Sequence, residues 1–293
     1  MGKEPPRISV VFPVRNEGKN VKMTLDSLFS VKTNIPFEAI IVDDASTDNG
    51  CHFIKTYVHN KNITYIRTNG IGPANARNLG ASRAKYEYLV FCDAHMTFEN
   101  FWLDRLIFPI LSNLSDAVCP AIASLDDPKV VGYGQSLNSN LRIKWNPKKR
   151  YLFETAILPG ACIVLSKKVF DEIGGFETGF ATWGHEDVEI SLKLWLFGYR
   201  CHCEPSVKIL HLFRTHHPYN VQYEGTYYNL MRMAYLHFDS DRIQKTKSLI
   251  IHNSPAVIEN RVLNDGVLSK KKLYEKRRKM QIDELFRKFR ISF

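Results

Sequence analysis

The first half of the chain alternates short apolar runs with segments of helical periodicity, and this alternation restricts the fold more than any other feature. The apolar, β-branched runs cover residues 8–14, 37–42, 63–66 and 88–92. Apolar residues with helical spacing follow at 20–31 and 73–84, and possible cap residues at 46–48 predict a further helix. Alternating strands and helices are typical of a mostly parallel sheet with helices on both faces. We therefore predict an α/β fold.

The second half is less regular. Residues 124–150 are rich in Asp, Asn, Pro, Lys and Gly, which predicts a long excursion or mobile loop. A buried strand is predicted at 158–165, and helices at 167–173 and 186–197. From residue 227 the pattern is helical, with no obvious strand after 215. We expect a catalytic domain at 1–220 and a helical, basic C-terminal extension at 221–293.

Length and composition are those of a globular protein. The chain has 293 residues, of which 44% are apolar, enough for a sizeable core. No apolar run approaches the roughly 18 residues that span a bilayer. The first residues contain no apolar stretch of the signal-peptide type. These features predict a cytoplasmic protein.

The net charge of +10 is concentrated at the C-terminus, because residues 270–293 hold ten Lys/Arg and three Asp/Glu and contribute +7. The remaining chain carries only +3 by subtraction, so nucleic-acid binding is not implied. Apolar residues of 282–293 fall on one helical stripe beside basic residues. This end could contact an anionic membrane peripherally, or pack on the protein's own body or across a homodimer.

Two predicted strands end in acidic residues. Asp43 and Asp44 follow one strand, and Asp93 and His95 follow another. Functional groups of such sheets gather beyond the carboxyl ends of the strands. A carboxylate and an imidazole suit a divalent ion such as Mn²⁺, which keeps open positions for phosphate oxygens. The alternative is that Asp93 caps a following helix and His95 is a surface residue.

Two later segments carry further candidates. Glu186 and Asp187 lie at a predicted helix start, where the helix dipole stabilises carboxylates, or where one carboxylate could act as general base for an acceptor. His211 ends a strand-like stretch and could complete a metal site with Asp93 and His95, or be a partly buried packing residue. No G-x-G-x-x-G follows the first strand, which argues against a dinucleotide oxidoreductase.

The order of these motifs resembles the GT-A glycosyltransferases of family 2, whose fold is a Rossmann-like nucleotide-binding domain. It resembles even more closely the polypeptide N-acetylgalactosaminyltransferases. The resemblance covers roughly residues 8–220 and depends on six segments, at residues 9–17, 41–46, 75–81, 93–95, 183–187 and 211–214.

The resemblance implies a role for each matching residue. Asp43 resembles the acid that reads the nucleotide base, and Arg77 the arginine beside the nucleotide. Glu186 resembles the acid that contacts the donor sugar, and the donor would be a UDP-sugar. The metal ligands, for Mn²⁺ or Mg²⁺, would be Asp93, His95 and His211. The residues expected to line the nucleotide pocket, besides Asp43, Arg77 and Asp93, are Pro13, Arg15, Glu17 and Asp44.

One departure from the resemblance bears on the mechanism. The aminosugar transferases have Gly-Gly-Glu-Asn where this chain has Gly-His-Glu-Asp at residues 184–187. A carboxylate can accept a proton and an Asn cannot, so we expect Asp187 to be the base of an inverting reaction, although the metal triad resembles retaining enzymes.

The expected acceptor is a peptide or protein. Transfer to a saccharide or lipid carrier in cell-envelope polysaccharide synthesis is an alternative. A non-catalytic module that binds nucleotide-sugars is an alternative of another class.

Overall fold

The computed structural model describes residues 5–293, and its strands form one 11-stranded sheet within that range. The path through the sheet is β3-β2-β1-β4-β10-β6-β11-β5. The first four strands of the chain form its parallel half, as predicted: β1 Ile8–Val14, β2 Phe37–Asp44, β3 Ile63–Thr68 and β4 Tyr88–Cys92. The carboxyl ends of β1, β2 and β4 therefore meet at one edge.

The other half of the sheet is mixed. Antiparallel β10 lies between β4 and β6, and β11 runs parallel to β6. The strands of this half have the bounds β5 Met96–Thr97, β6 Ala117–Ser124, β9 Phe153–Glu154, β10 Cys162–Ser166 and β11 Cys201–His211. The predicted strand at 158–165 thus begins four residues later than expected.

Residues 124–150 differ from the prediction of a loop, because they contain a hairpin. Strands β7 Val131–Leu137 and β8 Ile143–Asn146 pair with each other, and β7 pairs with β6. Strand β8 alternates apolar and polar side chains over Ile143–Asn146, but it has only four residues and is mostly exposed. The polar composition therefore concealed an edge strand, whose pairing depends on partners rather than on intrinsic propensity.

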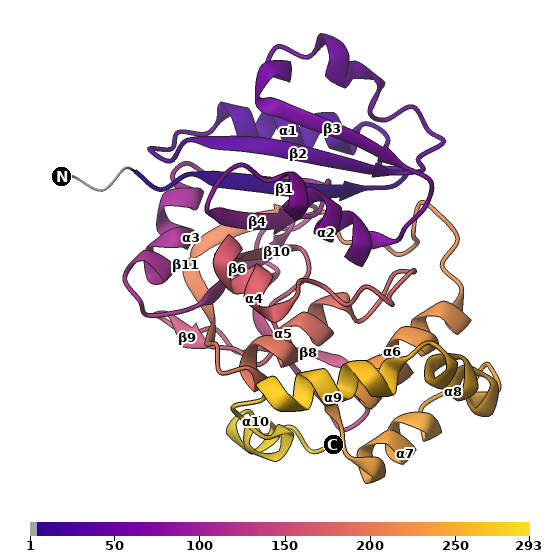
Figure 1. Ribbon diagram of the computed structural model, residues 1–293. Coiled ribbons are helices and arrows are strands. Elements are labelled where there is room, and N and C mark those ends of the chain that lie inside the picture. Colours follow the sequence, from indigo (N-terminus) through magenta and orange to yellow (C-terminus); the bar gives the residue numbers. More distant parts are fainter. Residues whose placement is uncertain (1–4) are drawn as a thin grey trace.

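Helices cover both faces of the sheet (Figure 1). Helices α1 Asn20–Ser30 and α3 Trp102–Leu111 pack on one face, in a core that includes Val10 and Phe12. On the other face, the core around Val11 and Phe91 is covered by α2 Pro73–Arg83, α4 Lys167–Ile173 and α5 Glu186–Leu196.

The α-helix predicted after residues 46–48 does not form. The chain makes two short 3₁₀ segments instead, η1 His52–Thr56 and η2 Asn60–Asn62. The carboxylate of Asp48 accepts hydrogen bonds from the amides of Gly18 and Gly50, and Asn49 adopts a φ of 58°. Asp48 therefore closes a turn rather than capping a helix.

Five helices complete the chain at the end of the molecule opposite α1 and β3 (Figure 1). Their bounds are α6 Tyr223–His237, α7 Ser240–Ser248, α8 Pro255–Asn264, α9 Val267–Arg277 and α10 Ile282–Lys288. Ile282, Leu285 and Phe286 are buried in the same core as α5, so the apolar stripe packs on the protein's own body. Among residues 5–293, no helix is both long and apolar enough to cross a bilayer.

Candidate active site

A cavity of about 980 Å³ opens at the carboxyl ends of β1 and β4, beside the start of α5. The predicted site residues that line it are Pro13, Arg15, Glu17, Asp44, Arg77, Asp93, His95, Glu186, Asp187 and His211. Asp43 is the predicted residue that does not line it. Segments nearly two hundred residues apart in sequence thus contribute to one concave site.

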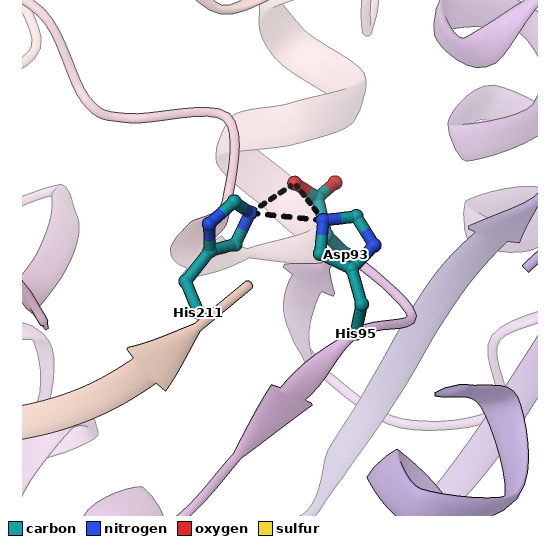
Figure 2. A group of neighbouring side chains, drawn as sticks. All are labelled: Asp93, His95 and His211. Atoms are coloured by element: carbon teal, nitrogen blue, oxygen red, sulfur yellow. Dashed lines mark hydrogen bonds and ion pairs between the residues drawn. The ribbon is translucent and has the colours of Figure 1, made fainter. Parts of the chain in front are cut away.

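Asp93, His95 and His211 form a compact cluster in this cavity (Figure 2). Their ligand atoms all lie within 4.8 Å of one another. The two Nε2 atoms of the histidines are 3.0 Å apart, and His211 Nε2 is 3.2 Å from Asp93 Oδ2. His211 is the last residue of β11, and β11 pairs with β5, which begins just after His95. This pairing brings the two imidazoles together.

The alternatives for Asp93 and His95 differ from the structure. The short strand β5 follows Asp93, so Asp93 does not cap a helix. The side chains of His95 and His211 are only 13% and 12% exposed, and their rings face each other across the cluster.

The surroundings orient His95 toward the cluster. His95 Nδ1 is 3.2 Å from Glu17 Oε2, so His95 can donate there and keep the Nε2 lone pair for a ligand. Glu17 is itself held by the guanidinium of Arg214, which approaches both carboxylate oxygens. The Nε2 atom of His211 faces Asp93, and its Nδ1 atom is buried without a hydrogen-bond partner among the described residues. One carboxylate and two such imidazoles are a donor set suited to Mn²⁺ or a similar divalent ion.

The two aspartates at the end of β2 have different environments. The Asp43 carboxylate is buried and accepts hydrogen bonds from the Ser46 amide, the Tyr65 hydroxyl and the Arg67 guanidinium. Burial alone would raise the pKa of Asp43, but these partners lower it overall. Asp44 instead binds the amides of residues 71 and 72 and so fixes the loop before α2.

Arg77 connects the cluster of Asp93, His95 and His211 to α5. Its side chain is 5% exposed, and Nη2 donates to Asp93 Oδ1 at 3.0 Å. Its Nη1 lies 3.5 Å from Glu186 Oε1. A buried guanidinium between two carboxylates compensates both charges and fixes their spacing.

Glu186 and Asp187 begin α5, after a sharp turn in which His185 has a φ of 67°. Glu186 Oε2 accepts from the Gly184 amide at 2.8 Å. Asp187 accepts from the amides of Gly160 at 3.1 Å and Val188 at 2.8 Å. Burial raises the pKa of both carboxyls, which favours their action as proton acceptors near neutral pH.

Other cavity residues were not assigned roles from the sequence. The Arg15 guanidinium lies 5.2 Å from the centre of the Tyr219 ring, and the rings of Trp183 and His217 are 4.4 Å apart. These contacts bring the chain after β11 across the cavity. The only signal for them was the dense run of Arg, His and Tyr at residues 214–219.

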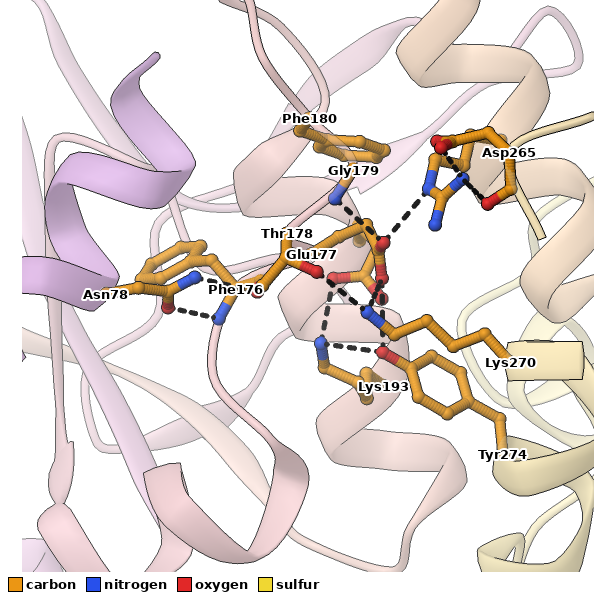
Figure 3. Close-up of polar contacts among 12 residues, drawn as sticks. Asn78, Phe176, Glu177, Thr178, Gly179, Phe180, Lys193, Asp265, Lys270 and Tyr274 are labelled. Carbon is orange, nitrogen blue, oxygen red and sulfur yellow. Dashed lines mark hydrogen bonds and ion pairs between the residues drawn. The ribbon is translucent and has the colours of Figure 1, made fainter. Parts of the chain in front are cut away.

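The segment between α4 and α5 is fixed by a buried polar network (Figure 3). Glu177, which is fully buried, is approached by Lys270 at 2.8 Å and the Tyr274 hydroxyl at 3.2 Å, both from α9. On α5, the Lys193 ammonium is 3.1 Å from Glu189. The C-terminal helices therefore contact the segment that leads into Glu186.

Comparison with known proteins agrees with this geometry. Residues 9–174 match the family described as glycosyl transferase family 2, and residues 143–218 match the N-terminal domain of galactosyltransferase. Polypeptide N-acetylgalactosaminyltransferase 8 of Drosophila melanogaster is 30% identical over 229 residues, and polypeptide N-acetylgalactosaminyltransferase 3 of Mus musculus is 31% identical over 246. These alignments cover 71% and 73% of the chain but only 38% of each relative's own length.

Solved structures show the same fold. The crystal structure of GalNAc-T7 with UDP, GalNAc and Mn²⁺ superposes with a TM-score of 0.71 at 18% identity, over 94% of this chain and 57% of that one. S. aureus TarS 1-349 in complex with UDP-GlcNAc superposes with a TM-score of 0.59 at 20% identity, over 89% and 72%. The GT-A-like fold predicted from the sequence is thereby confirmed. Because the first family match spans more than half of the sequence, the chain belongs to glycosyl transferase family 2.

Proposed function

We propose that this chain is a metal-dependent glycosyltransferase that moves a sugar from a UDP-sugar to a peptide or protein acceptor. The observation that carries the proposal is the cluster of Asp93, His95 and His211 inside a cavity that Arg77, Glu186 and Asp187 also line. The names of the curated relatives support the peptide acceptor.

The cluster fits a divalent cation, and Asp93, His95 and His211 would be its ligands. The two imidazoles bring their Nε2 atoms to within 3.0 Å of each other, so that one cation could bind both. When bound, such an ion would neutralise the charge of the departing diphosphate. Glu17 would keep His95 in the ligating tautomer, and Arg214 would keep Glu17 ionised and oriented.

The residues of the first turn and the opposite loop would bind the nucleotide. Pro13 and Arg15 line the cavity on one side, and Tyr219 covers it from the other. That Asp43 reads the nucleotide base stays a prediction. In the structure, its carboxylate accepts hydrogen bonds from Ser46, Tyr65 and Arg67. We therefore propose that Asp43 holds Arg67 and the turn at residues 44–46 in place.

Asp187 would accept the proton of the acceptor hydroxyl, and the product would have the inverted anomeric configuration. Its two oxygens each accept one amide hydrogen and each retain a second lone pair, and the residue lines the cavity. Glu186, whose carboxylate is tied to Gly184, would orient the sugar ring. NMR analysis of the anomeric proton in the first product formed would distinguish inversion from retention.

A donor screen tests the proposed function. The protein is incubated with Mn²⁺, with a panel of UDP-sugars and with a mixture of serine- and threonine-containing peptides, and released UDP is measured. We expect one UDP-sugar to give UDP in a reaction that stops when EDTA removes the metal. If the protein binds UDP but releases UDP from no UDP-sugar, a non-catalytic binding module is favoured.

Several expectations about the setting of the enzyme stay predictions. They are a division at residue 220 between catalytic domain and extension, a cytoplasmic location, peripheral contact of the extension with anionic membranes, and a homodimer. Sedimentation with vesicles containing phosphatidylserine, with and without residues 270–293, would test the membrane contact. Light scattering would test the dimer.

A further inference from the structure

Strand β8 and the chain after it form an exposed, strongly basic surface beside the cavity. We call residues 142–151 the basic strip. Its cationic side chains, all exposed, are Arg142, Lys144, Lys148, Lys149 and Arg150. No Asp or Glu occurs between residues 128 and 153. Five cations without an acidic neighbour in sequence create a positive potential over this part of the surface.

These charges are not compensated by the fold either. Within residues 5–293, no carboxylate pairs with any of the five cations, and Arg150 contacts only the ring of Tyr151, at 5.2 Å. Two basic residues of the C-terminal extension do have such partners, because Lys270 pairs with Glu177 and Lys288 with Glu154. The basic strip therefore keeps its charge available for a ligand.

The basic strip is continuous with the cavity. Arg142, Ile143 and Trp145 line it. The Trp145 ring meets the Phe213 ring edge-on at 6.5 Å, and Phe213 lies 4.6 Å from the ring of His211. A line of aromatic rings thus leads from the proposed metal ligand to the basic strip. An acceptor whose hydroxyl reaches Asp187 can extend outward along this line.

The form of the strip suits an extended peptide. Among the described residues, β8 pairs with β7 alone, so its other edge offers main-chain groups to a further strand. Ile143, Trp145 and Tyr151 are 41%, 36% and 70% exposed, and they alternate with cations along the surface. Edge pairing recognises a peptide backbone, and the exposed rings and cations select the side chains.

We propose that the acceptor is an acidic peptide segment, which binds the basic strip through carboxylates that flank the modified serine or threonine. This inference depends on the proposed function for the reaction, and it adds the chemical class of the acceptor. Its physical basis is charge complementarity, which acts mainly on acceptor affinity and association rate.

Three synthetic peptides test the proposal. They share one central threonine and the same length, and the flanking positions carry Glu, Gln or Lys. With wild-type protein, Mn²⁺ and the active UDP-sugar, we expect the KM for the Glu peptide to be about tenfold below that for the Gln peptide, since several exposed ion pairs each contribute a little. The Lys peptide should bind more weakly than both. The preference should shrink in high salt, because exposed charges are screened.

The variant Lys144→Gln/Lys148→Gln/Lys149→Gln should remove most of the preference for the Glu peptide. A matched variant, Lys272→Gln/Lys276→Gln/Lys279→Gln, removes three exposed lysines of the C-terminal extension and should keep the preference. Binding of UDP checks that the donor cavity is intact in both. Equal KM values for the Glu and Gln peptides, or a preference that persists in the first variant, would overturn the proposal.

Binding of fluorescein-labelled peptides separates this inference from the proposed function. If no UDP-sugar is consumed with any peptide, the proposed function fails. Fluorescence anisotropy still decides the inference, because it needs no turnover. Tighter binding of the Glu peptide that depends on the three lysines supports it. Equal binding, or displacement only by heparin or RNA, contradicts it.

Discussion

The Arg232 guanidinium donates a 2.9 Å hydrogen bond from Nε to Oε1 of Glu177, and both side chains are buried. The same carboxylate oxygen accepts from the Gly179 amide at 3.0 Å. A Cβ atom at Gly179 would lie 2.1 Å from Arg232 Nε, so the backbone can approach only because this residue is glycine. Helix α6 thus fixes the beginning of the segment that ends at Glu186.

Replacing Arg232 by Met should lower the free energy of unfolding by about 3 kcal/mol, because it leaves Glu177 buried with an uncompensated part of its charge. Chemical denaturation would measure this loss. The double variant Glu177→Gln/Arg232→Met should lose less than the sum of the single variants. Lys22→Met serves as control, since it removes an exposed i,i+4 pair with Asp26 and should cost less than about 0.5 kcal/mol. Additive losses would contradict the coupling.

The acid sensitivity of the fold should depend on Glu177. Burial alone would raise the pKa of Glu177, but the charges of Lys270, Lys193 and Arg232 lower it to about 2. Because the pKa of Glu177 is lower in the folded state than in the unfolded state, its ionised carboxylate stabilises the fold at pH values above the unfolded-state pKa. This contribution is lost as the pH falls toward 2. The free energy of unfolding should therefore fall less steeply between about pH 5 and pH 3 in Glu177→Gln than in the wild type. If the free energy of unfolding of Glu177→Gln depends on pH as that of the wild type does, Glu177 does not cause the acid sensitivity.

Asn229→Asp should impair turnover more than nucleotide binding. The Asn229 amide donates to the carbonyls of Thr182 at 3.0 Å and Gly184 at 2.9 Å, and a carboxylate would place oxygens against both. Because the Gly184 amide holds Glu186, a displaced segment should lower kcat by about a hundredfold, the loss expected for a 1 Å misplacement. Hydrogen exchange should rise in residues 177–186 while the Kd for UDP changes little.

Tyr235→Phe is the matched control for Asn229→Asp. It removes a hydrogen bond of the same helix, from the Tyr235 hydroxyl to Glu259, on a side that does not contact this segment. It should leave kcat unchanged. Equal effects of the two variants on kcat would mean that α6 acts only through overall stability.

Metal affinity should depend on His211 directly and on Glu17 indirectly. Calorimetric titration with Mn²⁺ in the presence of UDP should show near-complete loss of binding in His211→Ala. Glu17→Gln should weaken binding by about 10- to 100-fold, as is usual for a residue that orients a ligating histidine. His252→Ala, which removes an imidazole beside Tyr223, should bind as the wild type does. Normal Mn²⁺ binding in His211→Ala would exclude the proposed cluster.

The pH profile of kcat should identify the base. Asp187 must be ionised to accept a proton, and burial raises its pKa above the ordinary value of 3.8. Activity should therefore fall on the acid side at a higher pH than a solvent-exposed Asp would give, and Asp187→Asn should lose at least a hundredfold in kcat. Because burial lowers the pKa of His185 to about 4, the variant His185→Gln is needed to separate its titration from that of Asp187. A profile unchanged in Asp187→Asn would exclude this base.

Local periodicity was sufficient for the parallel half of the sheet. Strands β1 to β4 and helices α1, α2 and α5 each lie within a few residues of their predicted bounds, because each has its own apolar pattern. The hairpin β7–β8 was missed because its stability comes from pairing with β6 and from Trp145 packing over Gly132. Such contacts leave no period in the sequence.

The acidic ends of two strands indicated the edge of the sheet at which the site lies, but the set of residues was supported mainly by the resemblance to a family. Nothing in spacing alone relates His211 to His95, since β11 and β5 become neighbours only in the completed sheet. The family motifs named both residues correctly as members of one cluster. They did not indicate that Asp43 is enclosed by Ser46, Tyr65 and Arg67, because Tyr65 and Arg67 lie outside the six motif segments.

Strand β10 has a consequence for how the protein is made. It lies between β4 and β6, both of which precede it in the sequence. Until residues 162–166 have left the ribosome, β4 and β6 lack the strand that joins them, and the nascent sheet keeps unpaired edges that attract other chains. Fragments that end before residue 162 should aggregate rather than fold, so the parallel half of the sheet is not an independent unit of synthesis.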